Sequence, residues 1–171
     1  MAASIPEVDP RRATTRLKRA LTNVALSGAG TWFYSKVAAR FDPWLVRLTR
    51  GRVTSALGMV PIVLLSTRGA RSGQTRTVAL LYFTDGEDVI LIASSFGRPL
   101  YPAWYHNIKA HPQVELEAMG RRGRYVAQEV TGPERERLYG LATNLYSGYE
   151  VYQQRASGTR RIPVLRLKPL S

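Results

Sequence analysis

Two apolar runs rich in β-branched residues, separated by a short polar loop, restrict the possible folds of this chain most strongly. Residues 61–66 and 75–84 have the length and composition of strands, and Gly69 and Gly73 lie between them, so the segment is predicted to form a β-hairpin. Asp85-Gly86 is a tight-turn signal before a third apolar run at residues 89–93, which predicts a third antiparallel strand. Consecutive antiparallel strands exclude a doubly wound nucleotide-binding fold, in which strands alternate with helices.

The hairpin loop is unusually basic. Arg68, Arg71 and Arg76 lie within nine residues, beside the two glycines. Backbone N–H groups freed by Gly69 and Gly73, with the three guanidinium groups close by, are predicted to form a concave anion site. The alternative is a solvated basic hairpin. The loop is not a P-loop, because the Gly-Lys-Ser/Thr element is absent and a strand follows where a helix is required.

Helices are predicted on both sides of these strands. Apolar residues have helical spacing from Arg16 up to Gly28, and a second, aromatic-rich helix is predicted from Thr31 to Phe41. After the third strand we predict a helix over 103–110, strands over 114–118 and 124–130 that turn at 120–123, a helix over 133–145 and a strand over 162–167. This order indicates an α+β fold around a small barrel or sheet, preceded by a basic helical segment at residues 1–60.

The formal net charge of +13 over 171 residues predicts an anionic partner: nucleic acid, an anionic membrane or a polyanionic small molecule. Residues 1–55 contain ten Lys and Arg residues against three acidic ones. A basic helix followed by an aromatic one can lie on an anionic membrane; packing of both helices on the core is the alternative. Nucleic acid is not expected, because the strands lack the stacked aromatic and basic residues of RNA-binding sheets.

Cysteine is absent, which excludes disulfides, thiolate metal ligands and a cysteine nucleophile. His106 and His111 are the two histidines, and no metal site is expected. The sequence has no run of about 20 apolar residues that could form a transmembrane helix, and its N-terminus lacks the apolar core of a signal peptide. The protein is therefore expected in the cytoplasm, peripheral at the inner face of the cell membrane if the basic helices bind lipid.

Aromatic hydroxyl groups form a second candidate site. Tyr146, Tyr149 and Tyr152 recur every three residues, which places their hydroxyls along one side of a helix or turn. A protonated phenol can donate a hydrogen bond or a proton to a reduced substrate; the alternative is an aromatic stripe that closes the core. Ser94 and Ser95 follow a strand, where their N–H groups are expected to face a planar heterocycle or a phosphate. No serine lies in a Gly-x-Ser-x-Gly motif, which argues against a hydrolase.

Several short motifs occur in a fixed order between residues 61 and 167. They are Thr67-Arg68-Gly69-Ala70-Arg71-Ser72-Gly73-Gln74-Thr75-Arg76, Leu80-Leu81-Tyr82-Phe83, Ala93-Ser94-Ser95-Phe96-Gly97, Pro102-Ala103-Trp104-Tyr105-His106-Asn107-Ile108-Lys109-Ala110-His111-Pro112, Tyr146-Ser147-Gly148-Tyr149-Glu150-Val151-Tyr152-Gln153 and Arg161-Ile162-Pro163-Val164. In this order they resemble the deazaflavin-dependent nitroreductase and quinone reductase family. The chain departs from that family in having Val78-Ala79-Leu80 where many relatives have Thr-Pro-Leu, and Phe96-Gly97-Arg98 where they have Lys-Gly-Gly.

The resemblance implies a split β-barrel of about six mainly antiparallel strands with flanking helices, which would bind its cofactor within residues 61–171. It implies an oxidoreductase that transfers hydride from reduced coenzyme F-420 to an electron-poor acceptor such as a quinone or a nitroaromatic. This coenzyme is an 8-hydroxy-5-deazaflavin with a phosphate and an oligoglutamate tail, which agrees with the basic hairpin. An FMN-dependent reductase on the same barrel and a non-enzymatic basic module that binds membrane or nucleic acid are the alternatives.

The resemblance also implies roles for individual residues. Tyr149 would be the catalytic residue, and Tyr146, Tyr152 and Tyr82 would contact the substrate. Arg71, Ser72 and Arg76 would hold the phosphate and the tail. The residues implied to contact the cofactor are Ala70, Arg71, Ser72, Arg76, Thr77, Val78, Ala79, Leu80, Leu81, Tyr82, Ala93, Ser94, Ser95, Phe96, Ala103, Trp104, Tyr105, His106 and Asn107.

Overall fold

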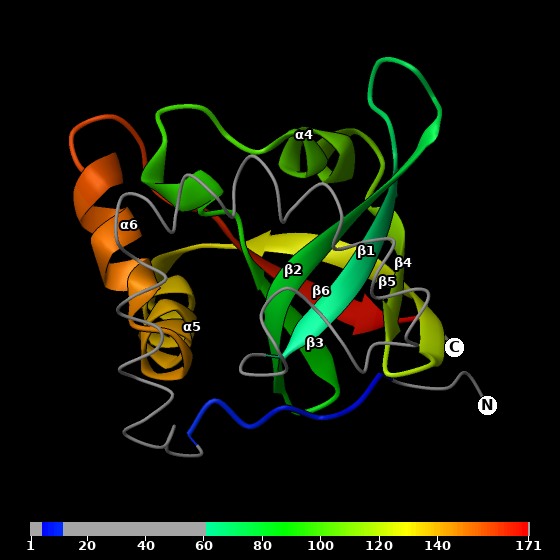
Figure 1. Ribbon diagram of the computed structural model, residues 1–171, viewed down its shortest axis with the longest axis horizontal. Helices are drawn as coiled ribbons and strands as arrows, with labels where there is room; N and C mark the ends of the chain where they lie inside the picture. The colour runs from blue at the N-terminus through cyan, green and yellow to red at the C-terminus, as the bar shows by residue number, and fades with distance from the viewer. Residues whose placement is uncertain (1–4, 12–60, 171) are drawn as a thin grey trace.

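A closed barrel of six strands, in the order β1-β2-β3-β6-β5-β4, forms the centre of the computed structural model, which describes residues 5–11 and 61–170 (Figure 1). Every neighbouring pair is antiparallel, and the pairing of β4 with β1 closes the barrel. The strands are β1 (Ile62–Arg68), β2 (Thr75–Asp85), β3 (Asp88–Ile92), β4 (Gln113–Ala118), β5 (Arg121–Val130) and β6 (Val164–Pro169). The predicted six-stranded barrel is therefore confirmed.

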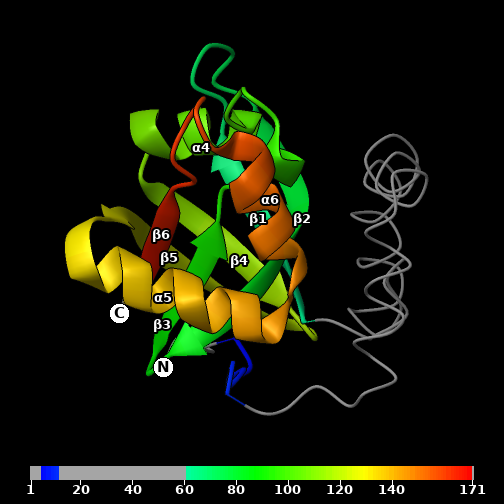
Figure 2. The same ribbon diagram turned by 90° about the vertical axis from the view of Figure 1, so that its left-hand side faces the viewer.

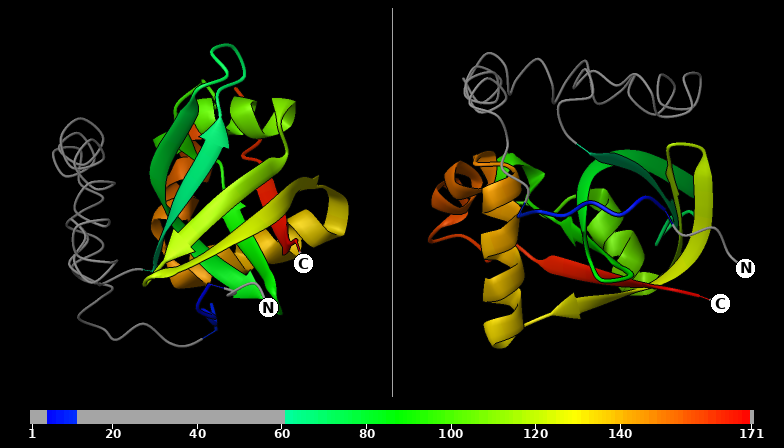
Figure 3. Two further views of the ribbon diagram at one scale, coloured as in Figure 1. Left: turned by 90° about the vertical axis from the view of Figure 1, so that its right-hand side faces the viewer. Right: turned by 90° about the horizontal axis from the view of Figure 1, so that it is seen from below.

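Three α-helices in the described part of the chain flank the barrel. Helix α4 (Ala103–Ala110) lies across one end, whereas α5 (Gly132–Leu145) and α6 (Gly148–Ala156) lie together on one side (Figures 2 and 3). A short 3-10 helix, η2 (Ser95–Gly97), follows β3 and contacts α6. None of the helices in the described ranges is long and apolar enough to cross a membrane.

The alternation of side chains along the strands produces two separate cores. Val63, Leu65, Leu91 and Leu116 point into the barrel, where they pack with Tyr125. The second core lies outside the barrel, under α5 and α6, and its buried members are Phe83, Ile90, Ile92, Val130, Leu138, Tyr139, Ala142, Tyr149, Tyr152, Ala156, Ile162 and Val164. We call this second core the outer cluster.

Residues 5–11 pack against the barrel. Ile5 lies in the barrel core, and the Tyr82 hydroxyl donates a hydrogen bond to the Pro6 carbonyl oxygen at 3.0 Å. Val8 and Thr84 exchange backbone and side-chain hydrogen bonds of 2.9 Å. The two helices predicted between residues 16 and 41, and the rest of the basic segment up to residue 60, lie outside the described residues.

Two local predictions were wrong. The turn between β4 and β5 is formed by Met119 and Gly120, at φ 49° and 77°, and not by residues 120–123. Both residues have positive φ, as the tightest hairpin turns require, so Arg121 already pairs with Ala118. Helix α6 was not predicted as an element of its own; it begins at Gly148, three residues after α5 ends.

Candidate functional site

The predicted site residues come from four segments near one end of the barrel. The tip of the β1–β2 hairpin and α4 lie at this end, and η2 lies between α4 and α6 (Figures 1 and 2). The arrangement agrees with the packing of α4 on β1 and of α6 on η2. The hairpin is therefore placed beside α4, and η2 is placed beside α6.

The hairpin loop closes on itself through its two glycines. The Gly69 N–H donates to the Gln74 carbonyl oxygen and the Gly73 N–H donates to the Gly69 carbonyl oxygen, both at 2.8 Å. Gly73 has φ +65°, in the left-handed region that favours glycine. A Cβ at Gly69 would lie 2.6 Å from the Ser72 hydroxyl oxygen, which can rotate away, and 3.1 Å from the Gln74 carbonyl oxygen. The prediction that these two N–H groups are free for an anion is therefore wrong.

Cationic side chains remain as the anion-binding groups of the loop. Arg68, Arg71 and Arg76 are exposed, and none of them forms an ion pair with a carboxylate among the described residues. Arg76 is oriented by a 3.0 Å hydrogen bond from its Nη2 to Gln74 Oε1. Three guanidinium groups without a carboxylate partner on one hairpin favour a polyanionic ligand.

Asn107 joins α4 to the hairpin. Its Nδ2 donates to Thr67 Oγ1, and its Oδ1 accepts from the Ala70 N–H, both at 3.0 Å. The resemblance implies that Ala70 and Asn107 contact the cofactor. In the structure the Ala70 N–H and the Asn107 side-chain oxygen bond to each other. The amide fixes the position of the loop relative to the helix, which the sequence did not predict.

The remaining residues of α4 divide between the barrel and solvent. Trp104 and Tyr105 are buried in the barrel core, whereas Ala103 and His106 are exposed. The Tyr105 hydroxyl donates to Glu129 Oε2 at 2.9 Å, and burial followed by this contact raises the pKa of Tyr105 to about 12. Within residues 103–107, Ala103 and His106 therefore have the side chains most accessible to a ligand.

The segment after β3 has an uncommon backbone. Ser95, Phe96 and Gly97 have φ values of 48°, 58° and 75°, in the left-handed region that side chains other than glycine rarely adopt. A Cβ at Gly97 would lie 2.7 Å from the Tyr152 carbonyl oxygen, so the segment packs directly on α6. The Phe96 ring meets Tyr152 edge to face at 5.8 Å.

Residues 77–82 of β2 divide between the two faces of the strand. Val78, Leu80 and Tyr82 belong to the barrel core, whereas Leu81 packs against the outer cluster. By alternation, Thr77 and Ala79 share the outer face with Leu81. Thr77, Ala79 and Leu81 are all half-buried, so this outer face can present side chains to a ligand outside the barrel.

Tyr146, Tyr149 and Tyr152 form one aromatic group. Their ring centroids are 5.4 Å apart for Tyr146 and Tyr149, 6.1 Å for Tyr149 and Tyr152, and 6.2 Å for Tyr146 and Tyr152. Tyr149 is 5% exposed and Tyr146 is half-buried, and the hydroxyls of Tyr146 and Tyr152 lie 3.3 Å apart in a hydrogen bond. Tyr82 does not join this group, because it lies inside the barrel.

Two arginines that sequence reasoning missed hold this region together. Arg135 is buried and donates to the Ile162 carbonyl oxygen at 2.8 Å and to Gln153 Oε1 at 3.3 Å, which links α5 to α6 and to the start of β6. Arg160 donates to carbonyl oxygens beside η2. The only signal in the sequence was a basic pair, Arg160-Arg161, before the last strand.

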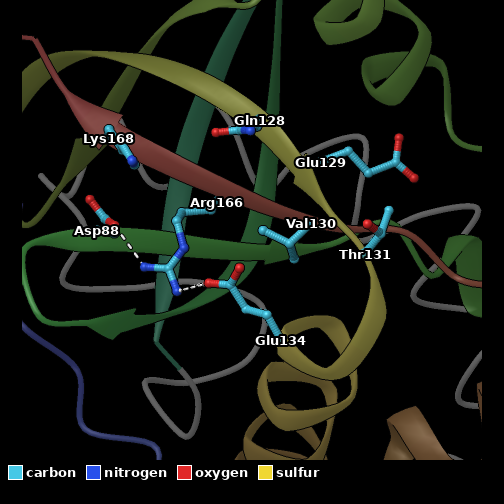
Figure 4. Close-up of a pocket in the computed structure, with 8 residues that line it drawn as sticks. All are labelled: Asp88, Gln128, Glu129, Val130, Thr131, Glu134, Arg166 and Lys168. Atoms are coloured by element: carbon cyan, nitrogen blue, oxygen red, sulfur yellow. Dashed lines mark hydrogen bonds and ion pairs between the residues drawn. The ribbon is translucent and has the colours of Figure 1, made fainter.

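A pocket of about 450 Å³ lies apart from these residues, between β3, β5, β6 and the start of α5 (Figure 4). Arg166 bonds there to Asp88 at 2.7 Å and to Glu134 at 2.6 Å. None of the residues implied to contact the cofactor or substrate lines this pocket. Its charged groups are mostly paired with one another, so we do not place the functional site there.

A barrel with exposed arginines at one hairpin, a half-buried strand face and an aromatic group is typical of a protein that binds a flat, anionic ligand. A sequence model of the F420H(2)-dependent quinone reductase family matches residues 38–169. The chain belongs to this family, which is a family of oxidoreductases that use coenzyme F-420. The predicted family, enzyme class and cofactor are thereby confirmed, and the FMN and non-enzymatic alternatives are set aside.

Individual relatives agree with this assignment. The chain is 39% identical over 132 residues to an F420H(2)-dependent quinone reductase of Mycobacterium tuberculosis, covering 75% of this chain and 87% of that protein. Among solved structures, a reductase dependent on reduced F-420 is 37% identical with a TM-score of 0.58, over 63% of this chain and 94% of that one. A domain-swapped dimer is 33% identical with a TM-score of 0.59, over 74% and 98% of the two chains.

The residues present fit coenzyme F-420. Phosphate and glutamate groups of its tail match the three exposed arginines, which have no carboxylate partner within residues 5–11 and 61–170. The outer face of β2 and the Phe96 ring provide apolar contacts for a flat ring system, since Leu81 and Phe96 both pack against the outer cluster without being fully buried.

Proposed function

We propose that this protein reduces a quinone with reduced coenzyme F-420 in the region bounded by the hairpin and α4 on one side and by η2 and α6 on the other (Figure 1). One observation carries the proposal: Leu81, Phe96 and Tyr146 all pack against the outer cluster that contains Tyr149 and Tyr152. The strand that carries Leu81 begins beside the basic hairpin loop. Strand β2 thus connects the cations proposed for the tail with the apolar face proposed for the ring, which packs on the cluster that contains the phenols proposed for the acceptor.

The arginines of the hairpin would bind the coenzyme rather than take part in chemistry. Arg71 and Arg76 would hold the phosphate and tail through charge-assisted hydrogen bonds, with Ser72 beside them. Thr77, Ala79 and Leu81 would lie along one face of the ring, and the segment 93–96 would hold its edge. Correct placement is the main contribution of the protein, because the bound coenzyme itself supplies the hydride.

The tyrosines would act on the acceptor. Negative charge develops on a quinone oxygen during reduction, and a neutral phenol stabilises that charge by donating a hydrogen bond. Burial raises the pKa of Tyr152, so its hydroxyl keeps its proton at neutral pH. We assign the donor role to Tyr149, flanked by Tyr146 and Tyr152. A nitroaromatic presents similar oxygen atoms and is the second acceptor to test.

The proposal is tested by mixing the protein anaerobically with reduced coenzyme F-420 and menadione, and by recording the visible absorbance of the oxidised coenzyme. Oxidation should be much faster than in the absence of protein, whereas the protein should not accelerate the oxidation of reduced FMN by menadione. A nitroaromatic acceptor in a parallel reaction ranks the two acceptor classes. A rate equal to that without protein, with every acceptor tried, would overturn the proposal.

Replacing Arg71 or Arg76 by alanine should weaken coenzyme binding roughly ten- to a hundredfold, because a charge-assisted contact contributes about 1.5–3 kcal/mol. Affinity should also fall as salt rises. Arg121→Ala is the matched control, since Arg121 is an exposed arginine at the β4–β5 turn. Equilibrium titration with the oxidised coenzyme measures all three variants. Parental affinity in both hairpin variants would place the tail elsewhere.

Contact with an anionic membrane is a further proposal, and it is supported by the ten basic residues within residues 1–55. Each cation near a charged lipid surface contributes about 1 kcal/mol. The protein should therefore sediment with phosphatidylglycerol vesicles at low salt and much less with phosphatidylcholine vesicles. High salt should release it. Equal recovery in the supernatant with both lipids would contradict the proposal.

A further inference from the structure

Arg160 lies where three parts of the proposed site meet. Its N–H bonds to the Ala156 carbonyl oxygen at 3.0 Å, just after α6 ends, and β6 begins four residues later. From this position its side chain reaches the segment that follows β3. The residue is half-buried, and no carboxylate among the described residues forms an ion pair with it.

All three nitrogen atoms of the Arg160 guanidinium donate hydrogen bonds to that segment. Nε donates to the Arg98 carbonyl oxygen at 2.8 Å, Nη1 to that of Ala93 at 3.3 Å and Nη2 to that of Ser94 at 2.6 Å. In the sequence the three acceptors flank Ser95, Phe96 and Gly97, whose backbone is in the left-handed region. A guanidinium has its donors in a fixed planar arrangement, so it can hold both ends of the segment at a set separation.

This segment needs an external restraint. Ser95 and Phe96 have positive φ although neither is glycine, and such residues persist only where surrounding contacts determine them. The hydrogen bonds within the segment, from Gly97 N–H to Ser94 O and from Arg98 N–H to Ser95 O, close its turns at 2.9 and 3.0 Å. These bonds are internal to the segment. Phe96 and Gly97 pack on Tyr152 of α6, and the Ala93 N–H donates to the Pro163 carbonyl oxygen. Arg160 adds three side-chain hydrogen bonds, to both ends of the segment.

Arg160 also contacts Tyr101, which lies in the chain that leads into α4. Its guanidinium carbon lies 4.8 Å from the centroid of the Tyr101 ring, and Tyr101 packs on Tyr105 with centroids 4.9 Å apart. Tyr105 is in turn bonded to Glu129 on β5. One side chain therefore links η2, the chain leading into α4 and the end of α6.

We propose that Arg160 is a positioning residue that holds residues 93–98 in the conformation that receives the deazaflavin ring. The inference rests on the proposed function, because it assumes that the coenzyme binds against this segment. Arg160 acts through backbone carbonyl groups and does not need to touch the coenzyme. Without the three hydrogen bonds, only a minor fraction of the molecules has the conformation that binds the coenzyme. The apparent affinity then falls in proportion to that fraction.

The test compares Arg160→Met, Arg160→Lys and Arg161→Met with the parent. Amide hydrogen exchange without coenzyme reports residues 93–101 directly, titration with oxidised coenzyme F-420 gives the affinity, and urea denaturation shows that each variant folds. We expect faster exchange in residues 93–101 and roughly ten- to hundredfold weaker binding in Arg160→Met. Arg161→Met, which removes an exposed neighbouring charge bonded to Glu136, should match the parent in both.

Arg160→Lys separates positioning from charge. Lysine keeps the positive charge but lacks the planar set of donors of a guanidinium. Amide exchange of residues 93–101 should therefore be as fast, and coenzyme binding as weak, as in Arg160→Met. Parental affinity in Arg160→Lys, or unchanged exchange of residues 93–101 in Arg160→Met, would overturn the inference. If the parent protein fails to bind the coenzyme, the proposed function fails, while the exchange data still decide whether Arg160 holds the segment.

Discussion

Replacing Tyr149 by phenylalanine should lower the turnover of quinone reduction by about 10²- to 10⁴-fold, the usual contribution of a positioned proton donor. Tyr149 is buried in the outer cluster, where a hydrogen bond to developing negative charge is stronger than in water. Coenzyme affinity should change far less, because the hairpin cations lie in a different segment. Steady-state rates with menadione at saturating coenzyme measure the effect.

Matched variants distinguish a catalytic hydroxyl from a packed ring. Tyr125→Phe removes a hydroxyl inside the barrel, where it accepts a 3.3 Å hydrogen bond from the Ile5 N–H, and turnover should remain near that of the parent. Tyr146→Phe and Tyr152→Phe remove the same mutual hydrogen bond. Their effects should therefore be similar to each other, mainly on apparent quinone affinity, and less than additive when combined. An unchanged rate in Tyr149→Phe would leave Tyr149 as a core residue.

Local sequence signals predicted most of the barrel. The helix at Ala103–Ala110 was predicted with the bounds that the structure shows, because Pro102 precedes it and His111-Pro112 follows it. The β1–β2 hairpin followed from two apolar runs around a glycine-containing loop. The β4–β5 turn was misplaced because Gly120 and Gly123 both suggested a loop. In the structure Gly123 is paired with Leu116 in the ladder, and no local signal distinguishes such a glycine from one in a turn.

The site was less accessible to sequence reasoning, because its geometry depends on contacts between distant segments. Spacing correctly indicated that the rings of the three tyrosines lie together, although Tyr146 precedes α6 and is joined to it by a turn. It could not show that Tyr82 points into the barrel, since the face of a strand is set by its register. Asn107 pairs with Thr67 and Ala70 across about 40 residues of chain, and Arg160 reaches carbonyl groups more than 60 residues away. Neither pairing has a local signature.

The largest effect on stability is expected at Arg166, which joins β6 to the β2–β3 turn and to α5. It bonds to Asp85 and Asp88 at 2.7 Å and to Glu134 at 2.6 Å. Its side chain is 13% exposed, and removing one partner from such a group leaves charges without compensation. Arg166→Met should lower the free energy of unfolding at pH 7 by about 3 kcal/mol, at the lower end of the range for buried pairs because Glu134 is partly exposed.

The pH dependence of this loss identifies its cause. Hydrogen bonds from Arg137 and Arg166 lower the pKa of Asp85 from 3.8 to about 2. In the parent this stabilisation is therefore complete above about pH 5 and is lost as the pH falls toward 2. In Arg166→Met the clustered carboxylates repel one another, and protonation relieves that repulsion. The deficit of the variant should therefore be largest at neutral pH and should shrink as the pH falls from about 5 toward 2 in urea denaturation. Arg122→Met, which removes an arginine 59% exposed and paired with Glu115 and Glu117, should cost less than about 1 kcal/mol at pH 7. A deficit at Arg166 that is no larger than this control, or that does not change with pH, would show that the carboxylate cluster is not what Arg166 stabilises.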